Sequence, residues 1–331
     1  MSPLLSINDL HVSFGTEPDT VDAVRGITLN VERGEIVGIV GESGSGKSAS
    51  MLSVMRLLAT SATTRGSVCF NGKDLFSASN REMREIRGGK IGMIFQDPMT
   101  SLNPSFRVRS QIVEAIVRHQ QVSTKVATTR ATDLLEVVSI PNPSASMSLF
   151  PHEMSGGMKQ RVMIAMAIAN APELLIADEP TTALDVTIQA QILEVLRGLR
   201  ETRGLSIVII THDLGVVAGL ADNVNVMYAG EIVESGDVDG LFYRSTHPYS
   251  RGLLSCVPRL DIRESALRPI GGYPPNLSEK SGGCSFQPRC QNATVLCKTT
   301  KPKLEPSVVT GLQVSCHNPM ALVSDNTVSI S

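Results

Sequence analysis

Short apolar runs alternate with segments of helical character through the first 240 residues of the chain. Five runs have the length and composition of buried strands: Ile36–Val40, Ile91–Phe95, Leu174–Ala177, Ser206–Ile210 and Val224–Tyr228. Strands buried on both faces read as continuous apolar runs, as in parallel sheets. Their alternation with helical segments predicts an α/β protein whose parallel sheet is covered by helices.

Three stretches depart from this pattern. The first 35 residues and Gly66–Leu75 consist of strand-like and turn segments, which predict a small antiparallel β-subdomain. Between Asp97 and Ser155, segments with polar faces around Gln111–Gln120 and Thr128–Val138 predict an inserted α-helical subdomain. After Gly240, proline and glycine become frequent and periodicity fades. We therefore expect a domain over residues 1–240, with its helical subdomain at about 97–165, and a loop-rich extension over 241–331.

Composition and charge narrow the class of protein. The chain has 331 residues, of which 42% are hydrophobic and 19% charged, as in ordinary globular proteins. Its net charge of −2 argues against nucleic acid as the main partner. No apolar run approaches the ~18 residues of a membrane-spanning helix, and the first residues lack the pattern of a secretory signal. We therefore expect a cytoplasmic protein.

A phosphate-binding loop follows the run Ile36–Val40. Residues 41–48 read GESGSGKS, which fits the pattern G-x-x-x-x-G-K-[ST], and a helix-compatible stretch continues to Leu58. A strand that feeds a glycine-rich turn into a helix directs several backbone N–H groups at one anion. The residues expected to bind a nucleoside triphosphate are Gly41, Ser43, Gly44, Gly46, Lys47 and Ser48, the last also through Mg²⁺. The fold expected is therefore a P-loop NTPase (RecA-like) core.

Two adjacent acids end the apolar run Leu174–Ala177. Asp178 lies at the strand tip, where it is placed to hold Mg²⁺. Glu179 projects beyond it and is placed to polarise an attacking water as a general base. An isolated acidic pair could equally be two solvated side chains, but a phosphate loop in the same chain favours the catalytic interpretation.

Ser155-Gly156-Gly157 precedes a second helical segment, which runs to about Ala169. A hydroxyl, two glycines and a helix N-terminus make a second anion site in the same chain. Here the sequence resembles the ATP-binding cassette (ABC) family, whose signature motif these residues match. The resemblance implies that two cassettes meet head to tail, so that the loop of one and the signature of the other enclose each ATP.

The remaining landmarks of that family occur in order. Gln96 matches the glutamine that senses the metal and the γ-phosphate, and His212 matches the switch histidine. Ala183-Leu184-Asp185 matches the segment that crosses the dimer interface, and Phe14 lies where the family places an aromatic on adenine. One departure is Met158, where the signature usually has glutamine, because methionine cannot reproduce the hydrogen bonds of an amide.

Two further segments resemble the peptide/nickel class of importers. These are residues 97–104, DPMTSLNP, and a tail with His247-Pro248-Tyr249, Pro274-Pro275-Asn276-Leu277 and Gly283-Cys284. The resemblance implies an ATPase at the cytoplasmic face of the cell membrane that energises uptake of dipeptides or oligopeptides. Its implied partners are a second ATPase subunit, two transmembrane permease subunits and an extracytoplasmic peptide-binding protein. Segment 97–110 would dock a permease.

Four of the six cysteines lie in the extension: Cys284, Cys290, Cys297 and Cys316. Disulfides are uncommon in the cytoplasm, and zinc sites usually have a tighter C-x₂₋₄-C pair. Iron–sulfur clusters accept four cysteines at looser spacing, and some tails of this importer class are similar in carrying one. We expect a [4Fe–4S] cluster, with zinc and unliganded thiols as the alternatives.

Other functions remain open on the sequence alone. Nickel or glutathione could be the cargo within the same class. A soluble cassette ATPase usually has two cassettes or a long coiled-coil insertion, and this chain has neither. A metal-sensing module with an idle ATPase is disfavoured because Glu179 and His212 are both present.

Overall fold

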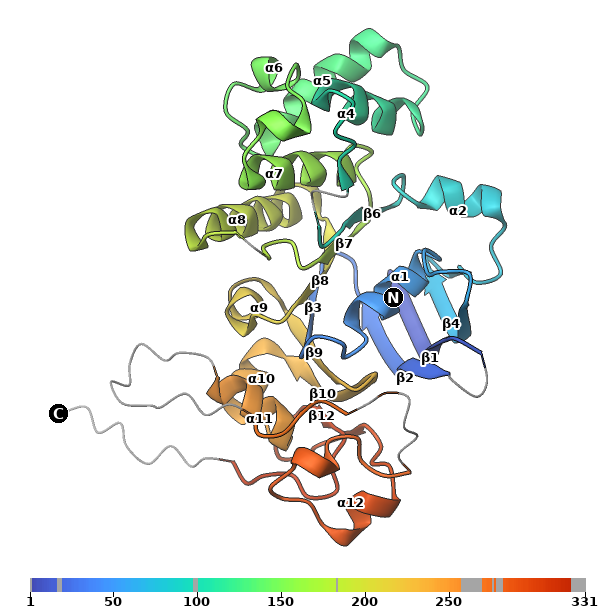
Figure 1. The fold of residues 1–331 in the computed structure, drawn as a ribbon, viewed down its shortest axis with the longest axis vertical. Helices are drawn as coiled ribbons and strands as arrows, with labels where there is room; N and C mark the ends of the chain where they lie inside the picture. The colour runs from blue at the N-terminus through green and yellow to red at the C-terminus, as the bar shows by residue number, and fades with distance from the viewer. Residues whose placement is uncertain are drawn as a thin grey trace, which may run out of the picture.

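Two β-sheets organise the chain, with helices packed between and around them (Figure 1). The structure is a computed structural model that describes residues 2–16, 20–97, 101–182, 184–256, 270–275, 277 and 282–322. Some residues named above lie outside this described part: Pro98, Met99, Thr100, Ala183 and Asn276.

The smaller sheet is antiparallel and has the strand order β2-β1-β4-β5. Its long strands are β1 (Leu5–Phe14), β2 (Val21–Val31) and β4 (Ala62–Phe70), and β5 (Lys73–Asp74) forms the edge. Strand β1 lies in the middle and pairs with both β2 and β4. The predicted β-layer is therefore confirmed, and β4 begins four residues earlier than the segment expected from Gly66.

The larger sheet has the order β11-β12-β10-β9-β3-β8-β7-β6. The five neighbouring strands from β9 to β6 are parallel, and β10, β12 and β11 continue the sheet antiparallel. The bounds are β3 (Ile36–Val40), β6 (Ile91–Ile94), β7 (Leu174–Asp178), β8 (Ser206–Thr211), β9 (Asn223–Tyr228), β10 (Glu231–Asp237), β11 (Glu305–Pro306) and β12 (Gln313–Val314). The parallel strands are the five apolar runs, so the predicted α/β core is confirmed.

Helices cover both faces of this sheet and form the insertion. Helix α1 (Lys47–Val54) follows β3, and α2 (Asn80–Ile86) precedes β6. The insertion comprises α4 (Val108–Val117), α5 (Thr124–Val137), α6 (Pro143–Ser146), a 3₁₀ turn (Pro151–Glu153) and α7 (Gly156–Ala167). Then follow α8 (Val186–Arg203), α9 (Leu214–Leu220), α10 (Val238–Arg244), α11 (Pro248–Ser255), a 3₁₀ turn (Gln287–Arg289) and α12 (Val295–Thr299).

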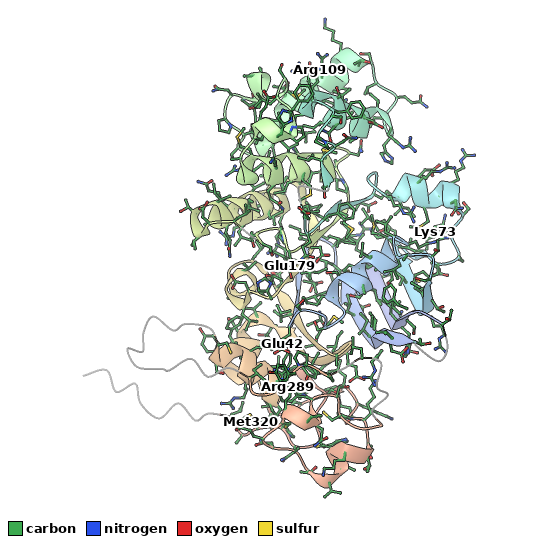
Figure 2. The ribbon with its side chains drawn as sticks, in the orientation of Figure 1. Glu42, Lys73, Arg109, Glu179, Arg289 and Met320 are labelled. Atoms are coloured by element: carbon green, nitrogen blue, oxygen red, sulfur yellow. The ribbon has the colours of Figure 1, made fainter. Side chains whose placement is uncertain are left out.

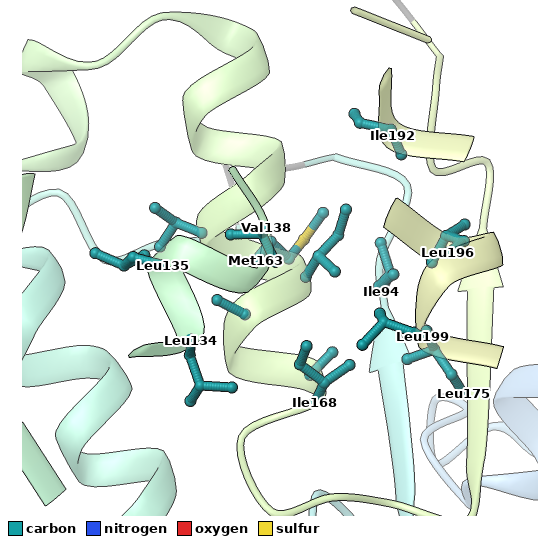
Figure 3. Close-up of a cluster of buried hydrophobic side chains, with 14 of the residues drawn as sticks. Ile94, Leu134, Leu135, Val138, Met163, Ile168, Leu175, Ile192, Leu196 and Leu199 are labelled. Carbon is teal, nitrogen blue, oxygen red and sulfur yellow. The ribbon is translucent and has the colours of Figure 1, made fainter. Parts of the chain in front are cut away.

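Alternate residues of the parallel strands serve two different cores. In β8, Ile207 and Ile209 face α8 and the helical insertion, whereas Val208 and Ile210 face α1 and the antiparallel sheet. This follows from the two-residue side-chain period of a strand. Figure 3 shows the first core, where Leu196 of α8 packs near Ile94 of β6. The large sheet therefore lies between the helical insertion and the antiparallel subdomain.

Two features differ from the sequence-based expectation. Helix α1 ends at Val54 rather than Leu58, because Arg56 takes a left-handed φ of 49° that breaks the helix. The extension is also joined to the core, because β12 pairs with Glu234 and Ser235 of β10. Its irregular chain therefore contributes strands to the edge of the large sheet (Figure 1). A search of the described residues finds no helix with the length and hydropathy needed to span a bilayer.

The position of α8 on the sheet gives a test of this core. Leu196 is fully buried, and its replacement by alanine leaves a cavity between α8 and the strands. We expect Leu196→Ala to lower the free energy of unfolding by about 2–5 kcal/mol in urea titrations of the full chain. Val186 of the same helix is 83% exposed, so Val186→Ala should change it by less than about 0.5 kcal/mol. Equal effects of the two variants would contradict this packing.

Candidate functional site

The phosphate loop makes a tight turn between β3 and α1. Gly46 precedes the helix with a φ of 98°, a left-handed conformation that favours glycine. A Cβ atom on Gly46 would lie 2.3 Å from the carbonyl oxygen of Ala23, and one on Gly41 would lie 2.2 Å from that of Met227. Backbone approaches of this kind leave no room for a side chain. The close packing of the turn against β2 and β9 therefore requires glycine at both positions.

Lys47 is the first residue of α1 and is only 5% exposed. Its Nζ donates to the carbonyl oxygens of Gly41 and Glu42, at 2.8 Å and 2.9 Å. Burial lowers the pKa of this ammonium, and the charges of Glu179 and Asp178 oppose that shift. A buried cation that is held only by carbonyl oxygens and nearby carboxylates is a ready partner for an anion. Its placement at a helix N-terminus favours phosphate.

Asp178 ends β7 beside the loop and is almost fully buried. Its Oδ1 accepts a hydrogen bond of 2.9 Å from the Ser48 hydroxyl, which belongs to the first turn of α1. Burial raises the pKa of Asp178, and the bond from Ser48 counters part of that rise. A carboxylate and a hydroxyl are hard oxygen ligands of the kind that Mg²⁺ prefers. The two predicted metal ligands are therefore together, with a chemistry that fits the ion.

Glu179 gathers polar groups from several elements around one carboxylate. Its Oε2 accepts from Thr182 Oγ1 at 2.7 Å and from Gln96 Nε2 at 3.1 Å, and its Oε1 lies 3.3 Å from His212 Nδ1. Burial would raise the pKa of Glu179, but the bonds from Thr182 and His212 outweigh it and lower that pKa. The carboxylate is therefore ionised near neutral pH, as a general base requires.

This cluster lies where neighbouring parallel strands end. Gln96 follows β6, Glu179 follows β7 and His212 follows β8, so their carboxyl ends meet at one edge of the sheet. Figure 2 shows Glu179 near the middle of the molecule. Sequence reasoning predicted these three residues but missed Thr182. Its position three residues after Glu179, in a polar turn, is the signal that could have found it.

Ser155, Gly156 and Gly157 begin helix α7 in the helical insertion (Figure 1). The Ser155 hydroxyl caps the helix by accepting from Met158 N at 3.3 Å. The Met158 side chain packs against the core of the insertion, which accounts for an apolar residue where the family has glutamine. Asp185 similarly caps α8 by accepting from Ile188 N. Both motifs therefore lie at helix N-termini, where the positive end of the helix dipole favours an anion.

Phe14 ends β1, where it is partly buried and packs against the core of the antiparallel sheet. The segment after Gln96 is held by Gln111 of α4, whose amide bonds both backbone groups of Asn103 and the Phe106 carbonyl. Phe106 itself is 55% exposed. A cavity of about 350 Å³ beside it is also lined by Gln111, Arg118, His119 and Met166. This face of the helical insertion is therefore open at Phe106.

The four cysteines of the extension influence one another electrostatically. Burial raises the pKa of Cys316 to about 11, and the charges of Cys284, Cys290 and Cys297 add to that rise. Within the described part of the chain, however, no group of three or more His, Cys, Asp or Glu side chains is arranged to hold a metal ion. The expected [4Fe–4S] cluster is therefore without support in the arrangement of these side chains.

The extension reaches the phosphate loop at Glu42. The Glu42 backbone N donates to the Tyr249 hydroxyl at 2.9 Å, and the Glu42 carboxylate forms a bidentate ion pair with Arg289 at 2.7 Å and 3.0 Å. Figure 2 shows Glu42 and Arg289 side by side at the boundary between the core and the extension. Sequence reasoning assigned no role to these contacts, because they join residues 207 and 247 positions apart.

A phosphate loop on α1, an acid pair at the end of β7 and a serine-glycine cap on α7 define a cassette-type P-loop ATPase. Residues 24–182 match the family described as ABC transporter, and residues 233–297 match the oligopeptide/dipeptide transporter C-terminal region. The chain belongs to the ATP-binding proteins of ABC transporters. The predicted P-loop NTPase fold is thereby confirmed.

Its relatives include the dipeptide transport ATP-binding protein DppD of Bacillus subtilis, which is 50% identical over 304 residues and 91% of each chain. The oligopeptide transport ATP-binding protein OppD of Salmonella typhimurium is 49% identical, over 90% of this chain and 89% of that one. Among solved structures, a dimeric ATP-binding cassette in a post-hydrolysis state with ADP and Pi is similar at a TM-score of 0.65. It is 27% identical and covers 71% of this chain and 98% of that chain.

The raised pKa of Asp178 predicts a conflict between stability and metal binding. A buried acid whose folded pKa lies above its unfolded pKa destabilises the fold once pH rises through these values. We therefore expect Asp178→Asn to raise the free energy of unfolding of the nucleotide-free chain at pH 7.5, with a smaller gain at pH 5. Urea titrations at both pH values would measure it, with the exposed Asp133→Asn as control. A variant less stable than the wild type at pH 7.5 would contradict the account.

Proposed function

We propose that this chain is the ATP-hydrolysing subunit of a membrane importer for dipeptides or oligopeptides. The observation that carries the proposal is the union of a complete phosphate-loop site with the tail found in peptide transporters. The names of relatives at about 50% identity over most of the chain support the same cargo class. Nickel and glutathione remain alternatives within the class, because nothing in this chain contacts the cargo.

The proposed site assigns a task to each group at the sheet edge. Lys47 and the loop amides from Gly41 to Ser48 bind the phosphates of ATP, and Phe14 stacks on the adenine. Ser48, Asp178 and Gln96 hold Mg²⁺, which neutralises charge that develops on the phosphates. Support comes from the bond between Ser48 and Asp178 and from the ammonium of Lys47 beside them.

Glu179 is the proposed base, and His212 a partner of the γ-phosphate. The lowered pKa of Glu179 keeps it ionised, so that it can accept a proton from the attacking water. In the structure, Thr182, Gln96 and His212 surround its carboxylate at hydrogen-bonding distance. We infer that ATP draws His212 and Gln96 toward the phosphate and the metal, which frees Glu179 for water.

The proposed assembly needs a second cassette. Ser155 and Asp185 cap helices α7 and α8, and Gly156 and Gly157 begin α7. Both helices lie apart from α1 in Figure 1, so in this proposal these residues serve the ATP of a partner ATPase subunit. Two permease subunits would complete the transporter, one of them docked at the exposed face around Phe106, and an extracytoplasmic binding protein would deliver peptide. The chain would then lie at the cytoplasmic face of the membrane as a peripheral subunit.

We propose domain limits of 1–240 for the cassette, with the helical subdomain at about 97–165, and 241–331 for the extension. We also propose that Cys284, Cys290, Cys297 and Cys316 ligate an iron–sulfur cluster when it is supplied, which would cross-link the extension. The proposal rests on the number of cysteines in the extension and on their spacing in the sequence.

Glu179→Gln tests the catalytic assignment. The amide keeps the shape of the side chain but cannot take the proton, so we expect ATP turnover to fall by roughly 100-fold or more while ATP binding persists. Phosphate release and a binding titration would separate the two effects, and size-exclusion chromatography would detect an ATP-bound dimer. Glu201→Gln, on the exposed side of α8, is the control. Turnover equal to that of the wild type would remove Glu179 from the role of base.

The cysteine proposal has its own test in anaerobically purified full-length chain. We expect iron and acid-labile sulfide in about a 1:1 ratio to each other, with visible absorbance that Cys284→Ser abolishes. Cys256→Ser, at the end of α11, should leave them unchanged. Zinc without sulfide, or no bound metal at all, would overturn the cluster.

A further inference from the structure

Every backbone and side-chain polar group of Glu42, the second residue of the phosphate loop, has a partner. Its N–H donates to the Tyr249 hydroxyl at 2.9 Å. Its carbonyl oxygen accepts from Lys47 Nζ at 2.9 Å and from Ser45 N at 3.2 Å. Its carboxylate receives both terminal nitrogens of Arg289. Two of these three attachments come from the extension, outside the cassette core.

Arg289 is itself held rigidly. Its side chain is only 4% exposed, and its Nε donates to the Gly271 carbonyl at 2.9 Å. The guanidinium carbon lies 5.7 Å from the ring centroid of Tyr228 and 5.9 Å from that of Phe286. A bidentate pair with a stacked guanidinium fixes orientation as well as charge, which lysine cannot do. The position of the Glu42 carboxylate is therefore dictated by the extension.

Tyr249 is positioned by a second buried network. Glu234 of β10 is fully buried and accepts from Ser245 Oγ, Thr246 N and His247 N. Nδ1 of His247 in turn accepts from Tyr249 N at 3.1 Å and so caps α11. This chain of bonds fixes the start of α11 on the large sheet and aims the tyrosine hydroxyl at the loop.

An aromatic cluster joins the two networks. The rings of Tyr228, Tyr249 and Phe286 lie 4.5 Å to 5.4 Å apart, centroid to centroid, and Arg289 covers one side of them. Tyr228 belongs to β9, next to the loop strand β3. Through these rings, the core and the extension pack against each other next to Glu42.

A buried ion pair is a weak source of stability, because desolvation offsets much of the attraction. Apolar residues could fill this place with similar stability. The bidentate pair of Glu42 with Arg289 is therefore better explained by the conformation that it imposes on the phosphate loop than by added stability. The Lys47 ammonium has three N–H donors and uses two of them on the carbonyls of Gly41 and Glu42, so the third can be donated to a phosphate oxygen while Lys47, Ser45 and the extension hold Glu42.

We propose that Arg289 and Tyr249 are positioning residues of the ATP site, acting through Glu42 to hold the phosphate loop in its binding conformation. The extension is then a structural part of the nucleotide site as well as a tail of the transporter subunit. The inference rests on the proposed ATP binding at Gly41–Ser48. A loop that is competent for only a fraction of the time binds with an affinity reduced by that fraction.

The test compares Arg289→Gln and Arg289→Lys with Arg244→Gln in the full-length chain. Arg244 is an extension arginine paired with Asp237 at 3.5 Å on the exposed face of α10, so it is a matched control. Titration with a fluorescent ATP analogue and Mg²⁺ should show binding weakened about tenfold in both Arg289 variants and unchanged in the control. In turnover assays, KM should rise by a larger factor than kcat falls.

A double variant separates positioning from charge. If Arg289 only neutralised Glu42, then Glu42→Gln would restore binding to Arg289→Gln. We expect the double variant to bind ATP no better than Arg289→Gln. Its loss of affinity should also be no larger than that of either single variant, because both changes break the same ion pair. Restored binding, or Arg289→Lys equal to the wild type, would overturn the positioning role.

Hydrogen exchange of the nucleotide-free chain supplies a readout that does not depend on ATP. We expect faster exchange over residues 41–48 in Arg289→Gln and Arg289→Lys, at an unchanged melting temperature within a few degrees. Unchanged exchange and unchanged affinity would both contradict the inference. If the wild type and Arg244→Gln fail to bind ATP, the proposed function fails instead, and the exchange experiment still decides whether Arg289 orders the loop.

Discussion

The tight turn of the phosphate loop between β3 and α1 is the constraint on which the rest of the structure depends. Gly41 and Gly46 bring its backbone into contact with Met227 and Ala23, so side chains are excluded at both positions. The turn buries the ammonium of Lys47 among carbonyl oxygens. A buried cation is costly without counter-charges, and Asp178 and Glu179 supply them from the end of β7. The residues proposed for anion binding, metal binding and base catalysis therefore lie together around one buried charge.

The surrounding elements follow from that arrangement. The parallel strands bring Gln96, Glu179 and His212 to one edge, since each residue follows the carboxyl end of a neighbouring strand. The helical insertion is packed on the opposite face through Ile207 and Ile209, so it carries Ser155 away from α1. This separation supports the proposal that each ATP is shared with a second cassette. The extension contacts the phosphate loop through the ion pair of Arg289 with Glu42, and it adds strands β11 and β12 to the large sheet.

Local patterns were sufficient for the parallel strands and for the phosphate loop. Strand β3 is a continuous apolar run, and the loop pattern has its glycines at fixed spacing. Both features depend only on residues that are adjacent in the sequence, so both were predictable. The end of α1 was not predictable, because the left-handed turn at Arg56 depends on tertiary contacts of its guanidinium with Leu75 and Ala78. The pair of Glu42 with Arg289 was not predictable either, because it joins residues 247 positions apart. Gln96, Glu179 and His212 were predicted as site residues, but the hydrogen bonds that join them were not, and Thr182 was missed.

The most direct test of the account is an experimental structure of the full-length chain with Mg²⁺ and a non-hydrolysable ATP analogue. The account predicts that Lys47 Nζ donates to the outer phosphates, while Arg289 and Tyr249 keep their bonds to Glu42. It also predicts the metal between Ser48 and Asp178. Nucleotide bound away from the loop, or a loop that closes on phosphate only after Arg289 releases Glu42, would contradict it.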